Sequence, residues 1–263
     1  MEPLQIVLDA APAPALPLPE ELERLYGGPL CLSADTLYAN FVQTVDGVVA
    51  IPSLERSNAL IAAGSEGDRF LMGMLRASAD AVLIGSGTLA GSPRALWRAE
   101  GAFPPGAEAF ARLRESLGAP LHPEVVVVTG SGAIDPAHPL LESGAVVLTT
   151  ELGAASLADR LPAATTVLPL GGAGDLDPRR IVKALRARGH RRILSEAGPH
   201  LFGSLVGAGL VDELFLTVSP LLVGRGPDPR LGLVEDEALA PPPELELQGL
   251  RRDATHLFLR YRF

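Results

Sequence analysis

The chain has 263 residues, of which 47% are hydrophobic and 20% charged, as in globular α/β proteins. Its 22 Lys and Arg against 31 Asp and Glu give a net charge of −9, which argues against binding to nucleic acid. The single cysteine, Cys31, excludes an intramolecular disulfide framework and a zinc site with several cysteines. No apolar run approaches the ~20 residues of a membrane helix, and the first residues lack the features of a leader peptide, so we expect a cytoplasmic protein without membrane contact.

The first part of the chain is expected to form an N-terminal arm over residues 1–35, followed by one domain over residues 36–263. Residues 11–19 are rich in proline and alanine, which suits an extended chain. Pro19 suits a helix start, so a short helix should run through Tyr26 and end before Gly27-Gly28.

Strand-forming sequence begins at Leu37. Apolar and polar residues roughly alternate from Leu37 to Ala50, and Asp46-Gly47 marks a hairpin or bulge within them. Asp46 is the only acid of this segment.

A helix should follow residues 65–68, which resemble a capping box with Asp in place of Glu. Its buried stripe is expected at Phe70, Leu71, Met74 and Leu75. Arg69 and Arg76 lie nearly in line on the opposite face, where they either contact a phosphate or carboxylate or simply face water.

A short apolar strand, residues 79–84, leads into Gly85-Ser86-Gly87-Thr88-Leu89-Ala90, which formally fits the dinucleotide fingerprint G-x-G-x-x-A. The Rossmann interpretation fails, because Gly91-Ser92-Pro93 breaks the chain at once and no acid follows at the expected spacing. What remains is a glycine-rich loop whose N–H groups and Thr88 hydroxyl can hold a pyrophosphate. Arg94 and Arg98 then either bind an anion or are ordinary surface residues.

The middle of the chain has the βαβ rhythm of a parallel sheet covered by helices on both faces. We expect helices at 105–118, 154–160 and 178–188, and strands at 124–128, 145–148 and 166–170. Thr129 and Ser131 end one of these strands, where hydroxyls accept a phosphate or, more commonly, close a turn. The glycine run 171–174 is interpreted as a connection, since Asp177-Pro178 supplies the next helix start.

The segment from Arg192 to Gly224 organises the rest of the chain as strand, sharp loop, helix and strand. Pro199 suits the first position of the helix, which residues 207–209 should end, and Leu214 to Val218 should be the next strand. This places the free N–H groups of residues 199–202 beside Glu196, an arrangement that suits an anion but also fits an ordinary connection. After a proline- and acid-rich excursion, residues 244–249 and 255–261 should form a hairpin around residues 251–253.

Three sequences in this C-terminal part carry a resemblance to a known family. Glu-Ala-Gly-Pro-His-Leu at 196–201, Ala-Gly-Leu-Val-Asp-Glu-Leu at 208–214 and Ser-Pro-Leu-Leu-Val-Gly at 219–224 resemble the reductase domain of the bifunctional riboflavin-pathway deaminase-reductases. The similarity covers roughly residues 36–262 and implies a dihydrofolate reductase-like fold. This is a three-layer α/β/α structure whose mostly parallel sheet ends in an antiparallel C-terminal hairpin. The zinc motifs of the deaminase half are absent, so the resemblance implies reductase activity alone.

The resemblance also assigns roles to residues and implies NADPH as cofactor. Cofactor contacts are expected at Val42, Thr44, Gly85, Gly87, Thr88, Thr129, Ser131, Gly198, Pro199, His200 and Leu201. Substrate contacts are expected at Arg76, Arg98, Glu196 and Ser57, with Arg76 as the anchor of the substrate phosphate. Glu196 and Asp46 are the candidate proton donors, and no metal is expected.

Three functions remain open. The first is NADPH-dependent reduction of 5-amino-6-(5-phosphoribosylamino)uracil or a related pyrimidine in riboflavin biosynthesis, with hydride passing to the ribose C1′ as the sugar ring opens. The family's Ser-x-Trp and the acid before its proline are missing here, which motivates a dihydrofolate or pterin reductase as the second. The third is a non-catalytic nucleotide-binding protein. As in relatives, strands within Leu210 to Leu222 and the terminal hairpin are expected to pair across a homodimer.

Overall fold

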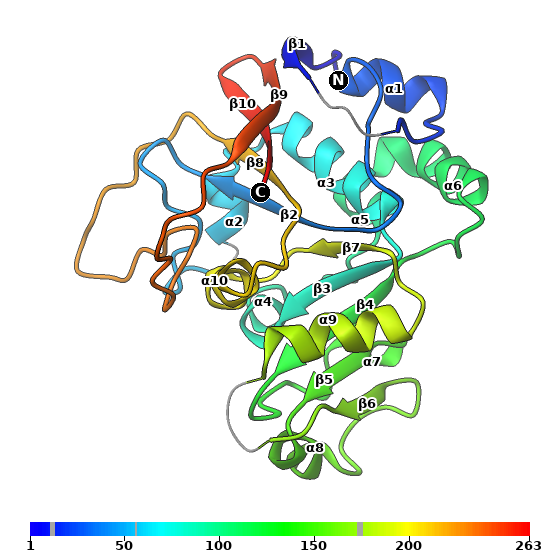
Figure 1. Cartoon of the computed structure of the whole chain (residues 1–263), viewed down its shortest axis with the longest axis vertical. Coiled ribbons are helices and arrows are strands. Elements are labelled where there is room, and N and C mark those ends of the chain that lie inside the picture. The colour runs from blue at the N-terminus through cyan, green and yellow to red at the C-terminus, as the bar shows by residue number, and fades with distance from the viewer. Residues whose placement is uncertain (11–13, 56, 173–175) are drawn as a thin grey trace.

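The computed structural model describes residues 1–10, 14–55, 57–172 and 176–263, and in these residues one ten-stranded sheet forms the centre of the molecule (Figure 1). The strand order is β1-β9-β10-β8-β2-β7-β3-β4-β5-β6. The strands are β1 Gln5–Asp9, β2 Thr36–Gln43, β3 Ala81–Gly85, β4 Glu124–Thr129, β5 Val146–Thr149, β6 Thr166–Pro169, β7 Arg192–Ser195, β8 Glu213–Val218, β9 Glu246–Asp253 and β10 His256–Arg262.

Helices cover both faces of this sheet. They are α1 Glu20–Tyr26, α2 Ser57–Ile61, α3 Glu66–Ser78, α4 Ser86–Ala90, α5 Ala99–Ala102, α6 Ala107–Ser116, α7 Pro139–Glu142, α8 Glu151–Leu157, α9 Pro178–Ala187 and α10 Pro199–Gly207, with a 3₁₀ turn at Pro104–Gly106. One apolar core lies between the sheet and α1, α3, α5 and α6, and a second lies between the sheet and α9 and α10. Among the described residues, no helix has the length and apolarity needed to span a membrane.

The predicted fold class is confirmed. Strands β2 to β8 pair in parallel along the sheet, and β8, β10 and β9 continue it as antiparallel neighbours. The terminal hairpin differs in its turn: β9 runs through Asp253, and the chain reverses at Ala254, which has a positive φ of 48°. The predicted turn at residues 251–253 is therefore wrong, because Arg251 is buried under Tyr26 within the strand.

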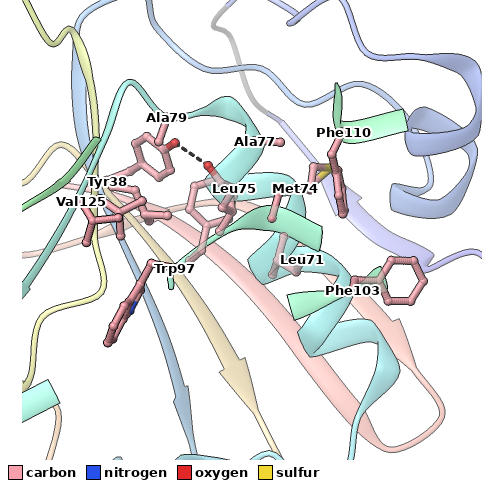
Figure 2. Close-up of a cluster of buried hydrophobic side chains, with 14 of the residues drawn as sticks. Tyr38, Leu71, Met74, Leu75, Ala77, Ala79, Trp97, Phe103, Phe110 and Val125 are labelled. Carbon is pink, nitrogen blue, oxygen red and sulfur yellow. Dashed lines mark hydrogen bonds between the residues drawn. The ribbon is translucent and has the colours of Figure 1, made fainter. Parts of the chain in front are cut away.

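Helix α3 packs into the first core by its apolar stripe, as predicted (Figure 2). Leu71, Met74 and Leu75 are fully buried, and Figure 2 shows them beside Phe103 and Phe110. Burying each such side chain contributes about 2 kcal/mol. The Tyr38 hydroxyl of β2 donates a 2.8 Å hydrogen bond to the Leu75 carbonyl, which fixes the helix above the sheet.

The N-terminal segment adds a strand that the sequence did not suggest. Strand β1 pairs antiparallel with β9, and α1 ends at Gly27, whose φ of 76° requires a residue that tolerates the left-handed region. Leu4, Leu22 and Leu25 enter the first core. Residues 11–13 of the proline-rich stretch and residues 173–174 of the second glycine run lie outside the described residues.

The strands expected to meet across a dimer, β8 and the β9–β10 hairpin, lie inside the described sheet. β8 has β2 and β10 as neighbours, and β9 has β10 and β1. The described sheet ends at β1 and β6 instead, so these strands have no free edge within one chain, and their pairing across a homodimer stays a prediction.

Strand β2 is also more central than its alternating pattern predicted. Residues 36–39 are buried on both faces, because Tyr38 packs into the first core and Leu37 and Ala39 pack into the second. The turn at Asp46-Gly47 is present, with Gly47 at a φ of 81°. Helix α8 begins three residues earlier than predicted, because the Thr150 hydroxyl accepts a hydrogen bond from Gly153 N at 3.0 Å and caps it.

Candidate active site

The carboxyl ends of β2, β3, β7 and β8 meet at one edge of the sheet. Strand β7 ends before its two neighbours at this edge. Its pairing with β2 stops at Ala39↔Ser195, and its pairing with β3 stops at Leu83↔Ser195. Strand β2 continues to Gln43 and pairs there with β8 alone. The sheet therefore opens a gap beyond β7, the position at which open α/β sheets bind their ligands.

The structure brings the two glycine segments together at this gap. A methyl group placed on Gly198 would lie 3.6 Å from the Thr88 hydroxyl. No described atom lies within 4 Å of a methyl group placed on Gly85 or Gly87, so both face open space. The second segment starts α10 as predicted, with Gly198 as N-cap and Pro199 in the first turn. The first is a short helix, α4, and not the predicted loop.

Arg76 and Glu196 form a bidentate ion pair at this edge. Arg76 Nε and Nη2 donate to Glu196 Oε1 and Oε2 at 2.7 and 2.6 Å, and each side chain is only 10% exposed. Arg76 Nη1 also donates to the carbonyl of Arg98 at 3.3 Å. These three predicted substrate residues thus lie together, with α3 held to the end of β7.

Asp46, the other candidate acid, lies in an exposed turn beyond β2. The Thr44 hydroxyl donates to its Oδ1 at 2.6 Å, and Gly224 N donates to its Oδ2 at 2.7 Å. These bonds, the Thr44 hydroxyl first, lower the pKa of Asp46 to about 2. The carboxylate is therefore charged at neutral pH and ties the segment after β8 to the turn.

Three of the other predicted residues have partners within the chain, and a fourth, Ser57, is placed only by its helix. Thr129 Oγ1 accepts from Gly132 N at 3.1 Å and Ser131 Oγ accepts from Ala133 N at 3.3 Å, so both hydroxyls close turns. His200 Nδ1 lies 2.8 Å from Asp236 Oδ2, in the excursion before β9. Ser57 begins α2, whose Ile61 packs with Val42 of β2.

The sequence did not single out Asp68, although it lies at this edge. Asp68 is 3% exposed on α3, on the side that faces the sheet. Burial raises its pKa to about 6, offset by the Thr217 hydroxyl and His256. A signal was available: Asp68 precedes Leu71 by three positions and Leu75 by seven, which places it on the buried stripe. We assigned it only as part of the helix cap, and the cap bond from Asp68 N to Ser65 Oγ is present at 3.1 Å.

Two shallow hollows lie elsewhere on the described surface. One is bordered by residues 17–21, Arg24, Arg112 and Ser116, and the other by residues between 154 and 169. None of the predicted site residues borders either hollow, so the gap beyond β7 remains the candidate site.

Comparison with known proteins identifies the family. The family model of the RibD C-terminal domain matches residues 35–259. The chain belongs to this family. Among curated proteins, none matches the chain significantly.

Solved structures of RibD-like proteins share the fold. A pyrimidine reductase-like protein of Corynebacterium diphtheriae superimposes with a TM-score of 0.71 at 21% identity, covering 92% of this chain and 97% of that chain. RibD of Acinetobacter baumannii gives a TM-score of 0.62 at 18% identity over 91% of this chain and 59% of that longer chain. The riboflavin biosynthesis reductase Rib7 of Saccharomyces cerevisiae gives 0.57 at 13% identity, over 87% of this chain and 90% of that chain. These structures share the fold of this chain, the mostly parallel sheet with an antiparallel C-terminal hairpin that the sequence predicted.

The edge of this RibD-family domain has the features that a dinucleotide needs. Gly85 and Gly87 leave space for phosphates to approach the backbone, and in the first turn of α10 the N–H groups of His200 and Leu201 have no partner in the described part of the chain. Beyond Ala39, strand β2 has no ladder partner on the side where β7 has ended. An amide such as a nicotinamide carboxamide suits that free backbone edge.

Proposed function

We propose that the protein is an NADPH-dependent reductase that acts on 5-amino-6-(5-phosphoribosylamino)uracil or a close relative. The observation that carries this proposal is the meeting of Gly198 with Thr88 at the gap beyond β7, in a domain of the RibD C-terminal family. The Arg76–Glu196 pair beside that gap supplies the polar groups for a phosphorylated substrate.

For the cofactor, we assign the phosphates to Gly85, Gly87 and Thr88 and the nicotinamide to residues 198–201 and the free edge of β2 from Val42 to Thr44. When bound, a reduced nicotinamide supplies a hydride to an electrophilic carbon. Thr129 and Ser131 end the neighbouring strand β4 and are assigned to the adenosine phosphate. Both would have to keep or exchange the turn bonds they now make.

For the substrate, we assign Arg76 to the phosphate and Glu196 to the sugar or ring. A guanidinium has five N–H groups, and three of those of Arg76 are engaged with Glu196 and the Arg98 carbonyl. The remaining N–H groups are available to a phosphate. Because Glu196 is fixed through both oxygens, it acts by orienting the substrate and not by moving during the reaction.

The proposal is tested by following NADPH oxidation with the purified protein. Turnover of the phosphoribosylaminouracil, and not of dihydrofolate, supports it. Turnover of dihydrofolate alone would replace it with the pterin reductase function. Tight NADPH binding, measured by fluorescence quenching, without turnover of either compound would favour a non-catalytic nucleotide-binding protein.

We also propose a homodimer, now through the β1 end of the sheet. Ile6, Val7 and Leu8 of this edge strand are 47%, 57% and 39% exposed. An exposed apolar edge strand of this kind pairs readily with another chain. A light-scattering mass of one chain would refute the dimer.

A further inference from the structure

The segment between α4 and α5 contains a residue with an unusual backbone conformation. Trp97 has a φ of 51°, in the left-handed region, where a bulky side chain is unfavourable. Of the non-glycine residues with a positive φ in the described part of the chain, it is the only aromatic one. A residue in such a conformation persists only where its surroundings hold it there, and such residues gather at functional sites.

The surroundings of Trp97 hold its side chain in place. The residue is 3% exposed and belongs to the first core, where Figure 2 shows it in the same cluster as Leu71 and Leu75 of α3. Its ring lies against that of His138, the N-cap of α7, with 6.2 Å between the ring centroids and 36° between the planes. The indole therefore cannot turn outward without leaving the core.

His138 is itself held by two hydrogen bonds. Leu140 N donates to its Nδ1 at 3.2 Å, so the ring proton is on Nε2, which donates to the Ser92 carbonyl at 3.0 Å. Ser92 N in turn donates to the Leu89 carbonyl of α4 at 3.1 Å. His138 thus holds residues 92–97 at both ends, Ser92 by a hydrogen bond and Trp97 by ring contact.

After Trp97 the chain reaches Arg76. Arg98 is the N-cap of α5, and its carbonyl accepts a 3.3 Å hydrogen bond from Arg76 Nη1. Helix α5 comes this close because α3 has a glycine one turn before Arg76: a methyl group on Gly73 would lie 3.0 Å from the Ala99 carbonyl. The direction of the chain at Trp97 therefore decides where the Arg98 carbonyl meets the guanidinium.

We propose that Trp97 is a positioning residue for Arg76. Its left-handed backbone turns the chain so that the Arg98 carbonyl receives Arg76 Nη1, and its indole, packed against His138, keeps the chain in that turn. The inference rests on the proposed reductase function, in which Arg76 anchors the phosphate of the substrate. Trp97 acts through Arg76 and is assigned no contact with the substrate.

The consequence for binding follows from the other bonds of the guanidinium. Glu196 holds Arg76 through Nε and Nη2, and the Arg98 carbonyl holds the third nitrogen, Nη1. An anchor held at all three nitrogens loses little freedom when a phosphate binds. The phosphate is remote from the reacting C1′ carbon, so a loosened anchor should raise KM and leave kcat nearly unchanged.

A tryptophan that only filled the core would behave differently. Truncating any large buried side chain lowers stability, but that loss alone does not weaken the binding of a phosphorylated ligand. Leu157 supplies the matched control, because it is 2% exposed in the same core and its helix, α8, packs on β5 and β6, away from α3.

The test measures KM and kcat for the phosphoribosylaminouracil in Trp97→Ala, Trp97→Phe and Leu157→Ala. We expect Trp97→Ala to raise KM by about fivefold or more, with kcat within about threefold of wild type. Trp97→Phe keeps a ring in the core and should bring KM back to within about twofold. Leu157→Ala should lower Tm but leave KM unchanged. NADPH affinity, followed by the fluorescence of NADPH itself, should be unchanged in all three, and an equal loss of NADPH affinity in Trp97→Ala overturns the inference.

A second variant leaves the tryptophan in place. His138→Ala removes the ring that lies against the indole, and the chain has one tryptophan, so its emission reports on Trp97 alone. We expect the emission to shift to longer wavelength as the indole loses its neighbour, and KM to rise with it. A wild-type KM in either His138→Ala or Trp97→Ala overturns the inference.

Ribose 5-phosphate separates this inference from the proposed function, because its binding needs no turnover. Calorimetric titration should show that it binds wild type and Trp97→Phe alike, and Trp97→Ala about fivefold or more weakly. If wild type reduces the pyrimidine and Trp97→Ala has the same KM, the function stands and the role of Trp97 falls. If the pyrimidine is not reduced but ribose 5-phosphate binding depends on Trp97, the role of Trp97 stands and the pyrimidine assignment falls. Equal binding to wild type and Trp97→Ala, or no binding to either, without turnover overturns both.

Discussion

Arg76 and Glu196 are 120 positions apart in the sequence, yet two charge-assisted hydrogen bonds join them at the edge of the sheet. The contact fastens α3 to the end of β7, so that the helix carrying Asp68 and the loop leading to Gly198 keep a fixed relationship. Because both side chains are largely buried, each charge depends on the other for its stability in the fold.

The first prediction concerns the cost of separating this pair. Arg76→Ala should lower the free energy of unfolding by about 3 kcal/mol, because it leaves a buried carboxylate uncompensated. Adding Glu196→Gln to Arg76→Ala should recover part of that loss. Urea denaturation of the two single variants and the double variant measures the coupling. Arg69→Ala is the control: its ion pair with Glu66 is exposed and should contribute within about 0.5 kcal/mol. Strict additivity of the two changes would contradict the prediction.

The sequence predicted the ends of helices well wherever a residue that starts or ends a helix stands at that position. Gly198-Pro199 marks the start of α10, and Asp177 caps α9 by accepting from Arg179 N at 2.9 Å. Gly27 ends α1 for the same kind of reason, since its left-handed backbone favours glycine. Each signal involves residues within four positions of one another.

The features that the sequence did not predict depend on contacts between residues far apart in the chain. Strand β1 follows no local rule, since it forms only because β9 offers an edge more than 240 positions away, as in the pair Gln5↔Arg252. In the sequence Asp68 looks like an ordinary residue of the helix cap, and only the structure shows that Thr217 of β8 lies beside it. Arg76 and Glu196 were also assigned their roles independently, and nothing in the sequence indicated that the two side chains bind each other.

The second prediction tests the cofactor assignment at Gly87. A valine side chain there meets no described atom within 4 Å of its Cβ and needs no unusual backbone, so Gly87→Val should fold normally. It should fill the space assigned to the cofactor phosphates and weaken NADPH binding at least tenfold, about 1.4 kcal/mol. Gly101→Val, at an equally open position in α5, should leave binding unchanged. Fluorescence titration of both variants decides the matter, and equal affinity for NADPH would remove Gly87 from the site.

The third prediction concerns Asp46 as a clamp. Its pKa is lowered in the folded state, so its contribution to stability is present above about pH 4 and disappears as pH falls through about 2. Asp46→Asn should therefore lower Tm at pH 7, and the difference from wild type should close toward pH 2. Amide exchange should quicken at Val223 and Gly224, which donate to this carboxylate. Asp228→Asn, in the exposed part of the same excursion, is the control, and equal exchange in both variants would argue against the clamp.

The fourth prediction concerns Asp68, where the change of stability with pH has the opposite sign to that at Asp46. Its pKa is raised from 3.8 to about 6 on folding, so the native state holds the proton more tightly than the unfolded chain. Stability should therefore decrease as pH rises from about 4 to about 6 and stay at the lower value above it. Asn cannot ionise, so Asp68→Asn should be more stable than wild type at pH 7, by an amount on the order of 2 kcal/mol, and this advantage should vanish near pH 4. Urea denaturation at both pH values measures it, with Glu66→Gln as the control that shows no such crossover. A gain in stability would show that Asp68 is not retained for the fold. A variant less stable than wild type at pH 7 would instead assign Asp68 to the fold.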